Sequence, residues 1–120
     1  MTNLILSLIA ALCLVESRGD SHAVGDNGRA IGVLQIHEIM VDEANRLAGC
    51  QRWSYSDRSD AGQSRQMAYM VISRRLARAG YNEPTPEALK YAIRLWNRGN
   101  EYYQRVIQEM EKSNEIPYHD

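Results

Sequence analysis

Hydrophobic residues form a long, almost unbroken run at the start of the chain. Residues 4–15 are apolar at every position except Ser7. A segment that is apolar on all sides predicts a helix that the rest of the domain surrounds on most sides. We expect this helix to end at residues 16–19, with Gly19 as its C-cap. Glu16 would then lie in its last turn, next to an apolar interior.

A removed signal peptide is the alternative interpretation of the same run. Its length suits the apolar region of a signal and falls short of the roughly 20 residues that a membrane span needs. However, no Lys or Arg precedes the run, no small residues that suit cleavage follow it, and Leu12 precedes Cys13 where a lipoprotein signal has a small residue. We therefore favour the buried helix and expect no stable membrane insertion.

The rest of the chain predicts four more helices, separated by polar segments. Their expected bounds are 35–47, 61–79, 86–96 and 101–112. Gly49 and Gly80 mark the ends of the first two, and Thr85 and Pro86 suit the N-cap and first position of the next. The inward face of the helix at 35–47 is expected to carry Ile36, Ile39, Met40, Ala44 and Leu47. Because no long segment alternates between apolar and polar residues, the fold class is mostly α.

The segment 20–32 interrupts this helical pattern. It contains four turn-forming residues, Gly25, Asn27, Gly28 and Gly32. Such a segment is too irregular for a helix and long enough for a small β-hairpin or a shaped loop. Because it directly follows the buried helix, we expect it to line a cleft. Residues 52–60, in contrast, have the composition of a polar linker.

Length and composition indicate one ordinary globular domain. The chain has 120 residues, of which 44% are hydrophobic and 24% charged, and this suits a single domain over 1–120 that we expect to be a monomer. The net charge of -1 disfavours a nucleic-acid binder held by bulk charge. Most of the 14 basic residues are Arg, which suits recognition of an anionic partner. We expect Cys13 and Cys50 to be free thiols in or near the core.

Two polar residues stand out against this framework. Glu16 follows the apolar helix, where loss of hydration raises the pKa of a carboxyl group, as a general acid near neutral pH requires. Its plainer alternative is a helix-terminal Glu that faces water. Gln35 lies between Leu34 and Ile36, so its amide needs hydrogen-bond partners if it is buried, although it could instead cap a turn.

Three short motifs follow one another along the chain. They are the pair Glu16-Ser17, the segment Gly32-Val33-Leu34-Gln35-Ile36, and the late stretch Trp96-Asn97-Arg98-Gly99. In this order and spacing they resemble the lysozyme-like superfamily of lytic transglycosylases, in which a Glu-Ser pair ends a buried helix, a Gly-x-x-Gln-Ile segment follows, and an aromatic-Asn-x-Gly motif lies on a late helix. Residues 25–32 and Trp96 also resemble goose-type and invertebrate-type lysozymes.

The resemblance implies a single lysozyme-like helical domain that acts on peptidoglycan glycan strands. The bond cleaved would be the β-1,4 bond between N-acetylmuramic acid and N-acetylglucosamine. Glu16 would protonate the glycosidic oxygen. In a lytic transglycosylase the same carboxylate then takes the proton of the sugar's own 6-hydroxyl, which closes a 1,6-anhydro ring. This chemistry needs no cofactor.

A hydrolytic lysozyme is the alternative outcome. It requires a second carboxylate across the sugar, at about 5–5.5 Å for retention or about 6.5–9.5 Å for inversion. Asp26 is the first candidate, because it lies in the expected cleft-lining loop at a place similar to the second acid of invertebrate-type lysozymes, and Asp20 is the next. Because Asp-Asn-Gly also forms turns on its own account, both outcomes stay open.

The resemblance also implies a set of substrate contacts. Gln35 would donate to N-acetyl or hydroxyl oxygens or hold the loop that does, and Trp96 would offer its ring face to a sugar unless it belongs to the core. Ser17 would bind Glu16 or the substrate, or cap its helix. Asn97 would hold the region of the acid or form a turn, and His37 would touch the substrate or stay solvated.

Two positions depart from the family's pattern. The family carries a Glu-Asn pair at the start of the third helix, whereas this chain has Asp60-Ala61-Gly62-Gln63, so we expect that contact to be lost. Arg98 replaces a small residue and could pair with a carboxylate of the muramyl peptide or obstruct the groove. A non-catalytic peptidoglycan-binding or structural module is therefore a rival interpretation, and a small DNA-binding helical regulator is a more distant one.

No metal site and no cellular location is indicated by the sequence. The histidines His22, His37 and His119 are far apart and lack paired ligand spacing. Because peptidoglycan lies outside the cytoplasm, a periplasmic, extracellular or phage-delivered protein would each fit the implied substrate.

Overall fold

The computed structural model describes residues 1–113 and 116, and within them it is mostly helical. The elements in chain order are α1 (Thr2–Ser17), β1 (Val24–Gly25), β2 (Ala30–Ile31), α2 (Glu38–Ala48), α3 (Ala61–Arg78), α4 (Pro86–Trp96) and α5 (Asn100–Lys112). Short 3₁₀ helices cover Asp26–Gly28 and Tyr55–Ser59. The predicted fold class and the small β-hairpin are confirmed, with Val24 paired to Ile31 and Gly25 paired to Ala30.

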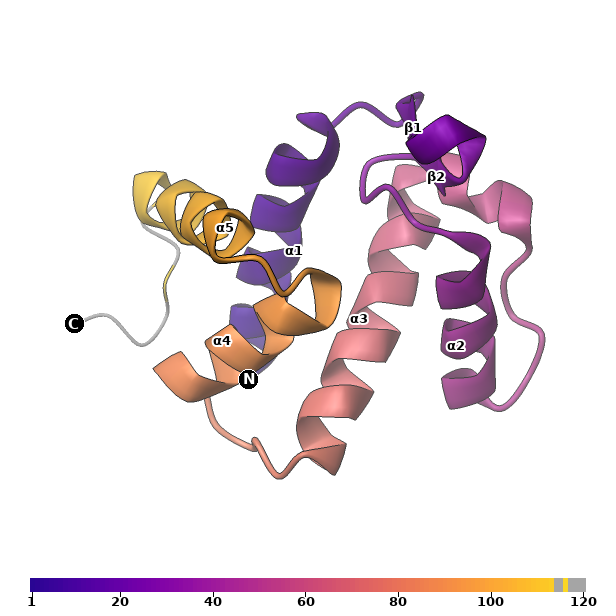
Figure 1. Cartoon of the computed structure of the whole chain (residues 1–120). Helices are drawn as coiled ribbons and strands as arrows, with labels where there is room; N and C mark the ends of the chain where they lie inside the picture. Colours follow the sequence, from indigo (N-terminus) through magenta and orange to yellow (C-terminus); the bar gives the residue numbers. More distant parts are fainter. Residues whose placement is uncertain (114–115, 117–120) are drawn as a thin grey trace.

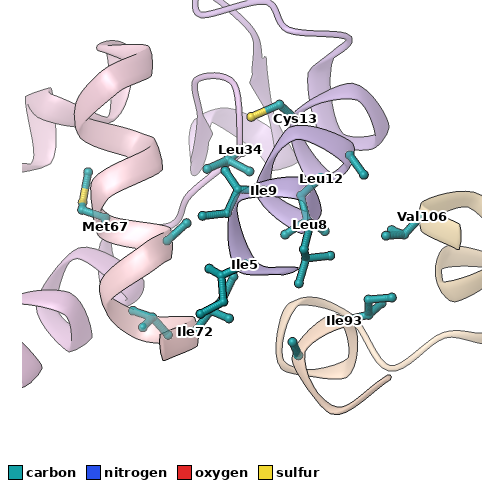
Figure 2. Packing of buried hydrophobic residues seen from close by; sticks show 14 of the residues in the cluster. Ile5, Leu8, Ile9, Leu12, Cys13, Leu34, Met67, Ile72, Ile93 and Val106 are labelled. Atoms are coloured by element: carbon teal, nitrogen blue, oxygen red, sulfur yellow. The ribbon is translucent and has the colours of Figure 1, made fainter. Parts of the chain in front are cut away.

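The first helix lies at the centre of the fold. Figure 1 shows α2 and α5 on opposite sides of the molecule with α1 and α3 between them, and α1 packs against α3, α4 and α5. Figure 2 shows Ile5, Leu8, Ile9 and Leu12 of α1 reaching toward the side chains of these neighbours. This packing positions the C-terminal turn of α1.

The prediction that α1 is buried on most sides is only partly right. Leu4, Leu8 and Leu12 are fully buried, but Leu6 keeps 53% and Leu14 43% of its surface exposed. Leu6, Ala10 and Leu14 recur every four residues, so one stripe of the helix faces outward. An apolar sequence on every side therefore did not mean burial on every side, because no described element covers that stripe.

Several predicted helix ends shift by one to three residues. Arg18, not Gly19, is the C-cap of α1; both residues have a positive φ, of 55° and 80°, and the Gly19 N–H donates to the Cys13 carbonyl. The second helix begins at Glu38 rather than at 35, because Gln35 also has a positive φ of 51°. Thr85 is the predicted N-cap of α4, accepting a hydrogen bond from the Ala88 N–H.

The inward face of α2 was predicted wrongly at one position. Ile39 keeps 77% of its surface exposed, while Val41 and Ala44 are buried. Because the helix starts later than expected, Ile39 falls in its first turn, where the helix leaves the hairpin region. The residue instead borders a hollow described below.

The segment 52–60 is not a polar linker but a structured connection. Trp53 is buried in it, and the Asn45 side chain accepts from the Arg52 and Trp53 N–H groups and donates to the Trp53 carbonyl. Arg58 is also buried, and its guanidinium donates to the carbonyls of Arg29 and Ile36. A buried arginine with backbone acceptors holds the hairpin against this segment.

The two cysteines differ from each other. Both are free thiols, as predicted, and Cys13 is buried in the core. Cys50 is exposed, so its expected place in or near the core is wrong: it follows Gly49, which ends α2 at the surface. Within residues 1–113 and 116, no helix combines the length and the hydropathy required to cross a bilayer.

Candidate active site

A hollow of about 440 Å³ separates the hairpin from the C-terminal end of α4. Six of the seven predicted site residues border it: Glu16, Asp26, Gln35, His37, Trp96 and Asn97. They come from the end of α1, the hairpin, the turn before α2 and the end of α4. We call this hollow the cleft. Segments that are distant in sequence thus pack together, and each of the three motifs contributes at least one residue to the cleft.

Glu16 is the half-buried acid of the cleft. Its pKa is raised above the usual value because burial removes water from the carboxylate. A hydrogen bond from Tyr102 and the positive charges of Arg105 and His37 act in the opposite direction but are weaker. A carboxyl group in this state holds its proton at a higher pH than an exposed glutamate does.

Tyr102 is a site residue that the sequence reasoning missed. Its hydroxyl donates to Glu16 Oε2 at 2.6 Å, and burial together with this carboxylate raises the pKa of the phenol. The available signal was helical spacing: Tyr102 lies four residues before Val106, which is buried on the inward face of α5. A phenol on an inward face needs a hydrogen-bond partner, and Glu16 is that partner.

Ser17 is the predicted site residue that does not border the cleft. Its hydroxyl donates to the carbonyls of Cys13 and Val33 and accepts from the N–H groups of Gly19 and Asp20. Of the predicted alternatives, the helix cap is therefore the one the structure shows. The bond to Val33, at 2.7 Å, also ties the end of α1 to the segment before Gln35.

Glu16 borders a second, smaller hollow on its other side. This hollow of about 310 Å³ is formed between the end of α1 and α5, and Ser17 and Arg105 also line it. Glu16 therefore lines two depressions of the surface.

Gln35 holds the hairpin side of the cleft together. Its side-chain amide donates to the carbonyls of Ala23, at 3.2 Å, and Gly32, at 3.0 Å. Its Oε1 lies so close to Gly25 that a Cβ at this position would overlap it. The turn-capping alternative thus has direct support, and the amide braces the loop while its residue borders the cleft.

Asp26 forms an ion pair across the mouth of the hairpin. Its Oδ2 lies 2.9 Å from Nε2 of His37, and both side chains are substantially exposed. Asp26 and the next residue, Asn27, both have positive φ, at 53° and 58°. Asp20, the second candidate for a further acid, accepts from the His22 N–H and does not border the cleft.

The late motif divides between two surfaces. Trp96 is half-buried at the cleft, and Asn97 beside it accepts a hydrogen bond from the Gly99 N–H at 2.8 Å, the turn-forming alternative. No hydrogen bond joins Asn97 to Glu16 among the described residues. Arg98 does not border the cleft and therefore does not obstruct it; it lines a different hollow on α4.

The segment that departs from the family's pattern has a structural use. Asp60 is the N-cap of α3, accepting from the Gln63 N–H, and Gln63 Oε1 accepts from the Trp53 indole at 2.9 Å. Neither residue borders the cleft. The expected loss of that family contact stays a prediction.

The part of the chain that the structure describes contains no cluster of three or more His, Cys, Asp or Glu side chains that could hold a metal ion. His37 is engaged with Asp26, His22 is exposed, and His119 lies outside the described residues.

Comparison with known protein families gives one match. The family model described as transglycosylase SLT domain matches residues 1–117. A search of curated proteins and a search of solved structures gave no match. The matched range includes every residue that borders the cleft.

Proposed function

The chain belongs to the transglycosylase SLT domain family, and from this membership we propose that it cleaves peptidoglycan as a lytic transglycosylase with Glu16 as its acid and base. The family indicates transglycosylase-type action on peptidoglycan in general. The bond cleaved, the products and the residues responsible are our proposal.

One observation carries the proposal. The Glu16 carboxyl is half-buried beside an open cleft, its pKa is raised by burial, and the Tyr102 hydroxyl fixes one of its oxygens. A glycosidic oxygen is a poor leaving group and must be protonated as positive charge develops on the anomeric carbon. A carboxylic acid whose pKa is raised by burial keeps its proton to a higher pH than an exposed one and can supply that proton.

In the first step, Glu16 donates its proton to the glycosidic oxygen between N-acetylmuramic acid and N-acetylglucosamine. The bond from C1 to that oxygen breaks, and the leaving sugar departs with a new hydroxyl group. Positive charge then develops at C1 of the muramic acid, and Glu16 is left as a carboxylate. Because it has lost its proton, the Glu16 carboxylate can act as the base in the next step.

In the second step, the Glu16 carboxylate takes the proton from the 6-hydroxyl of the same muramic acid. The oxygen O6 attacks C1 and closes a 1,6-anhydro ring. Glu16 regains its proton, so the enzyme returns to its starting state without consuming water. Only one carboxylate takes part.

The remaining cleft residues receive positioning and binding roles in this proposal. The exposed part of the Trp96 ring provides a flat surface on which a sugar can stack. Gln35 holds the hairpin at the correct distance, because both protons of its amide nitrogen point to loop carbonyls. Asn97 and His37 provide exposed polar groups at the cleft edge for N-acetyl or hydroxyl groups.

A hydrolytic lysozyme is the second candidate, because Asp26 borders the same cleft as Glu16. In that mechanism Asp26 would serve as the second carboxylate. The 2.9 Å contact with His37 and the exposed position of Asp26 favour the transglycosylase, because a carboxylate that is engaged by a neighbour and solvated by water is less ready to attack C1 or activate water.

The test is digestion of purified peptidoglycan by the protein and by Glu16→Gln, with mass spectrometry of the released fragments. We expect anhydro-muropeptides from the wild type and a rate lower by about 10²–10⁴ from the variant, the range that general acid catalysis contributes. Glu111→Gln, which removes an exposed carboxylate of α5 away from the cleft, is the matched control and should retain the wild-type rate.

The products decide between the candidate functions. Fragments with reducing ends in place of anhydro rings would identify the hydrolase. No release by either protein, combined with retention of both proteins on peptidoglycan, would identify a non-catalytic binding module and overturn the proposal.

A further inference from the structure

A third hollow is larger than the cleft, and the proposed reaction does not use it. It has a volume of about 690 Å³ and is formed by α4 and the C-terminal part of α3 with the residues after it. Four cationic residues line it: Arg75, Lys90, Arg94 and Arg98. We call this hollow the basic groove.

Two of these four cations, the side chains of Arg94 and Arg98, have no hydrogen-bond, ion-pair or ring partner among the described residues, whereas Lys90 Nζ lies over the Tyr103 ring, 5.9 Å from its centroid. Arg75 is engaged, because its guanidinium lies 2.6 Å from Oε1 of Glu43. Within residues 1–113 and 116, no salt bridge involves Lys90, Arg94 or Arg98, and Glu87 is the one acid that lines the groove. A concave surface with an excess of one charge concentrates ligands of the opposite charge.

Two tyrosines give the groove a second property. The rings of Tyr81 and Tyr91 both line it, with their centroids 5.1 Å apart and their planes tilted by 42°. Tyrosine faces pack well against planar amides and aliphatic side chains, and guanidinium groups bind carboxylates with two parallel hydrogen bonds. Cations with aromatic surface between them suit a peptide that carries carboxylates.

The basic groove adjoins the cleft at the end of α4. Leu95 and Arg98 line the groove, whereas Trp96 and Asn97, which lie between them in sequence, border the cleft. Asn97 and Arg98 are consecutive, so their Cα atoms lie about 3.8 Å apart and both hollows reach the C-terminal end of α4. A peptide of several residues on a sugar bound at Trp96 is long enough to extend to Arg98.

We propose that the basic groove binds the carboxylates of the stem peptide that muramic acid carries, so that the protein selects peptide-bearing glycan strands over bare ones. The proposal rests on the proposed function, because it places a muramic acid in the cleft. The stem peptide branches from the sugar, has carboxylate groups along its length, and is made of the planar amides that the tyrosine faces can cover.

A long polyanion is a weaker fit for the same groove. The whole chain has a net charge of -1, so no broad positive field attracts nucleic acid or a phosphodiester polymer. The positive excess is local to one hollow beside the cleft. Arg98, which departs from the family's pattern, would contact the part of the peptide nearest the sugar.

The test compares peptidoglycan strands that carry stem peptides with strands from which an amidase has removed them. The test variant is Lys90→Gln with Arg94→Gln, at two groove positions that do not line the cleft. The matched control is Arg74→Gln with Arg78→Gln, which removes the same charge from exposed positions of α3 outside the groove. Glutamine is a good helix former, so both variants should fold.

For the wild type we expect a lower KM on peptide-bearing strands than on bare strands. The groove variant should raise KM on peptide-bearing strands by about three- to tenfold, the range that two partly exposed ion pairs supply, and leave bare strands unchanged. The control variant should behave as the wild type on both. Equal KM values for the two substrates, or equal losses in both variants, would overturn the proposal.

A binding measurement separates this inference from the proposed function. Glu16→Gln, with and without the groove substitutions, is titrated with a soluble muropeptide at low salt. Weaker binding of the groove variant supports the inference even if the wild type shows no cleavage. Equal binding of the muropeptide by the two proteins overturns the inference. If a glycerol-phosphate polymer binds more tightly than the muropeptide and this binding depends on the same two residues, the groove serves a phosphodiester ligand, and the inference is also overturned.

Discussion

The two walls of the cleft hold their carboxylates in opposite ways. On one wall, Glu16 is placed by a helix whose buried residues pack on three other helices, and a tyrosine from α5 holds its oxygen. On the other wall, Asp26 lies in the turn that joins two strands of two residues each, and its backbone has a left-handed conformation. Its partner is the exposed side chain of His37.

The contrast explains how one kind of side chain acquires two behaviours. The helical wall is apolar, so burial raises the pKa of Glu16 and favours the neutral acid. The hairpin wall is open to water, so Asp26 stays accessible and pairs with His37. A fold with one such acid suits a reaction that needs a single group as acid and then as base.

The hairpin wall depends on the fit of Gly32. This residue has a φ of 84°, and a Cβ there would overlap the Arg58 carbonyl oxygen, which also accepts a hydrogen bond from Ser64. We expect Gly32→Ala to lower the free energy of unfolding by about 3 kcal/mol through backbone strain and steric overlap. Denaturant unfolding followed by circular dichroism measures this.

Gly28 provides the control for that substitution. It has a φ of 88° with open space around its Cα, so Gly28→Ala carries the backbone strain alone and should cost about 1 kcal/mol. Equal costs at the two positions would mean that the contact between the hairpin and Arg58 does not hold this wall.

The helical wall is tested by Tyr102→Phe. Loss of the hydroxyl leaves Glu16 without its orienting hydrogen bond, so we expect kcat to fall about tenfold, less than the roughly 10²–10⁴ that general acid catalysis contributes as a whole. Because that hydrogen bond lowers the Glu16 pKa, its removal should move the alkaline limb of the kcat profile to higher pH. A pH series on soluble glycan strands gives both quantities.

Tyr103→Phe is the control on the same helix, since Tyr103 is also half-buried but does not contact Glu16. An unchanged pH profile in Tyr102→Phe, with only a lower kcat, would contradict the proposed electrostatic effect of the phenol.

A stability measurement examines the acid itself. The folded-state pKa of Glu16 lies above its unfolded value, so the native state binds the proton more tightly than the unfolded state does. The free energy of unfolding contributed by this group is therefore present below about pH 4, near the unfolded pKa, and declines as pH rises through the folded value.

Glu16→Gln removes the destabilisation that the ionised carboxylate causes at high pH. The melting temperature of the variant should therefore exceed that of the wild type at pH 8 by on the order of a few degrees, and the difference should shrink toward pH 4. Differential scanning calorimetry at several pH values shows the trend. A variant that is less stable at pH 8 would indicate that the carboxylate is favourably placed as an anion.

The smallest effect is expected on the hairpin wall. In a transglycosylase, Asp26→Asn keeps the shape of the side chain and removes only the charge paired with His37, so the rate should change by about threefold or less, as for other exposed ion pairs. Release of soluble muropeptides of either kind over time measures it. A drop of a hundredfold would instead assign Asp26 the second catalytic role of a hydrolase.

Much of this cleft was predictable because its parts are local in sequence. The buried helix that ends at Glu16, the hairpin at 20–32 and the helix that ends at Trp96 each follow from spacing, glycine placement or an N-cap. The second motif also placed Gln35 near the acid, and His37 follows that motif in sequence. Their chemical roles stay predictions until the variants are tested.

Other features could not be predicted from the sequence because they depend on partners far along the chain. Tyr102 meets Glu16 across 86 positions, and nothing beside either residue marks the pair. The burial of Trp53 and Arg58 arises from acceptors on Asn45, Arg29 and Ile36, so a segment of polar composition became part of the interior. The exposure of Ile39 followed from a helix start that Gln35 delayed by its left-handed turn.

Periodic apolar residues and turn-forming glycines were enough to specify the helices, the hairpin and the position of an acid at the end of an apolar run, because hydrophobic burial and backbone sterics act over a few neighbouring residues. The protonation of that acid and the juxtaposition of the cleft with the basic groove came only from the packed chain. A carboxyl pKa depends on the water, charges and hydroxyl groups within a few ångströms in space, and those neighbours come from helices that the linear order keeps apart.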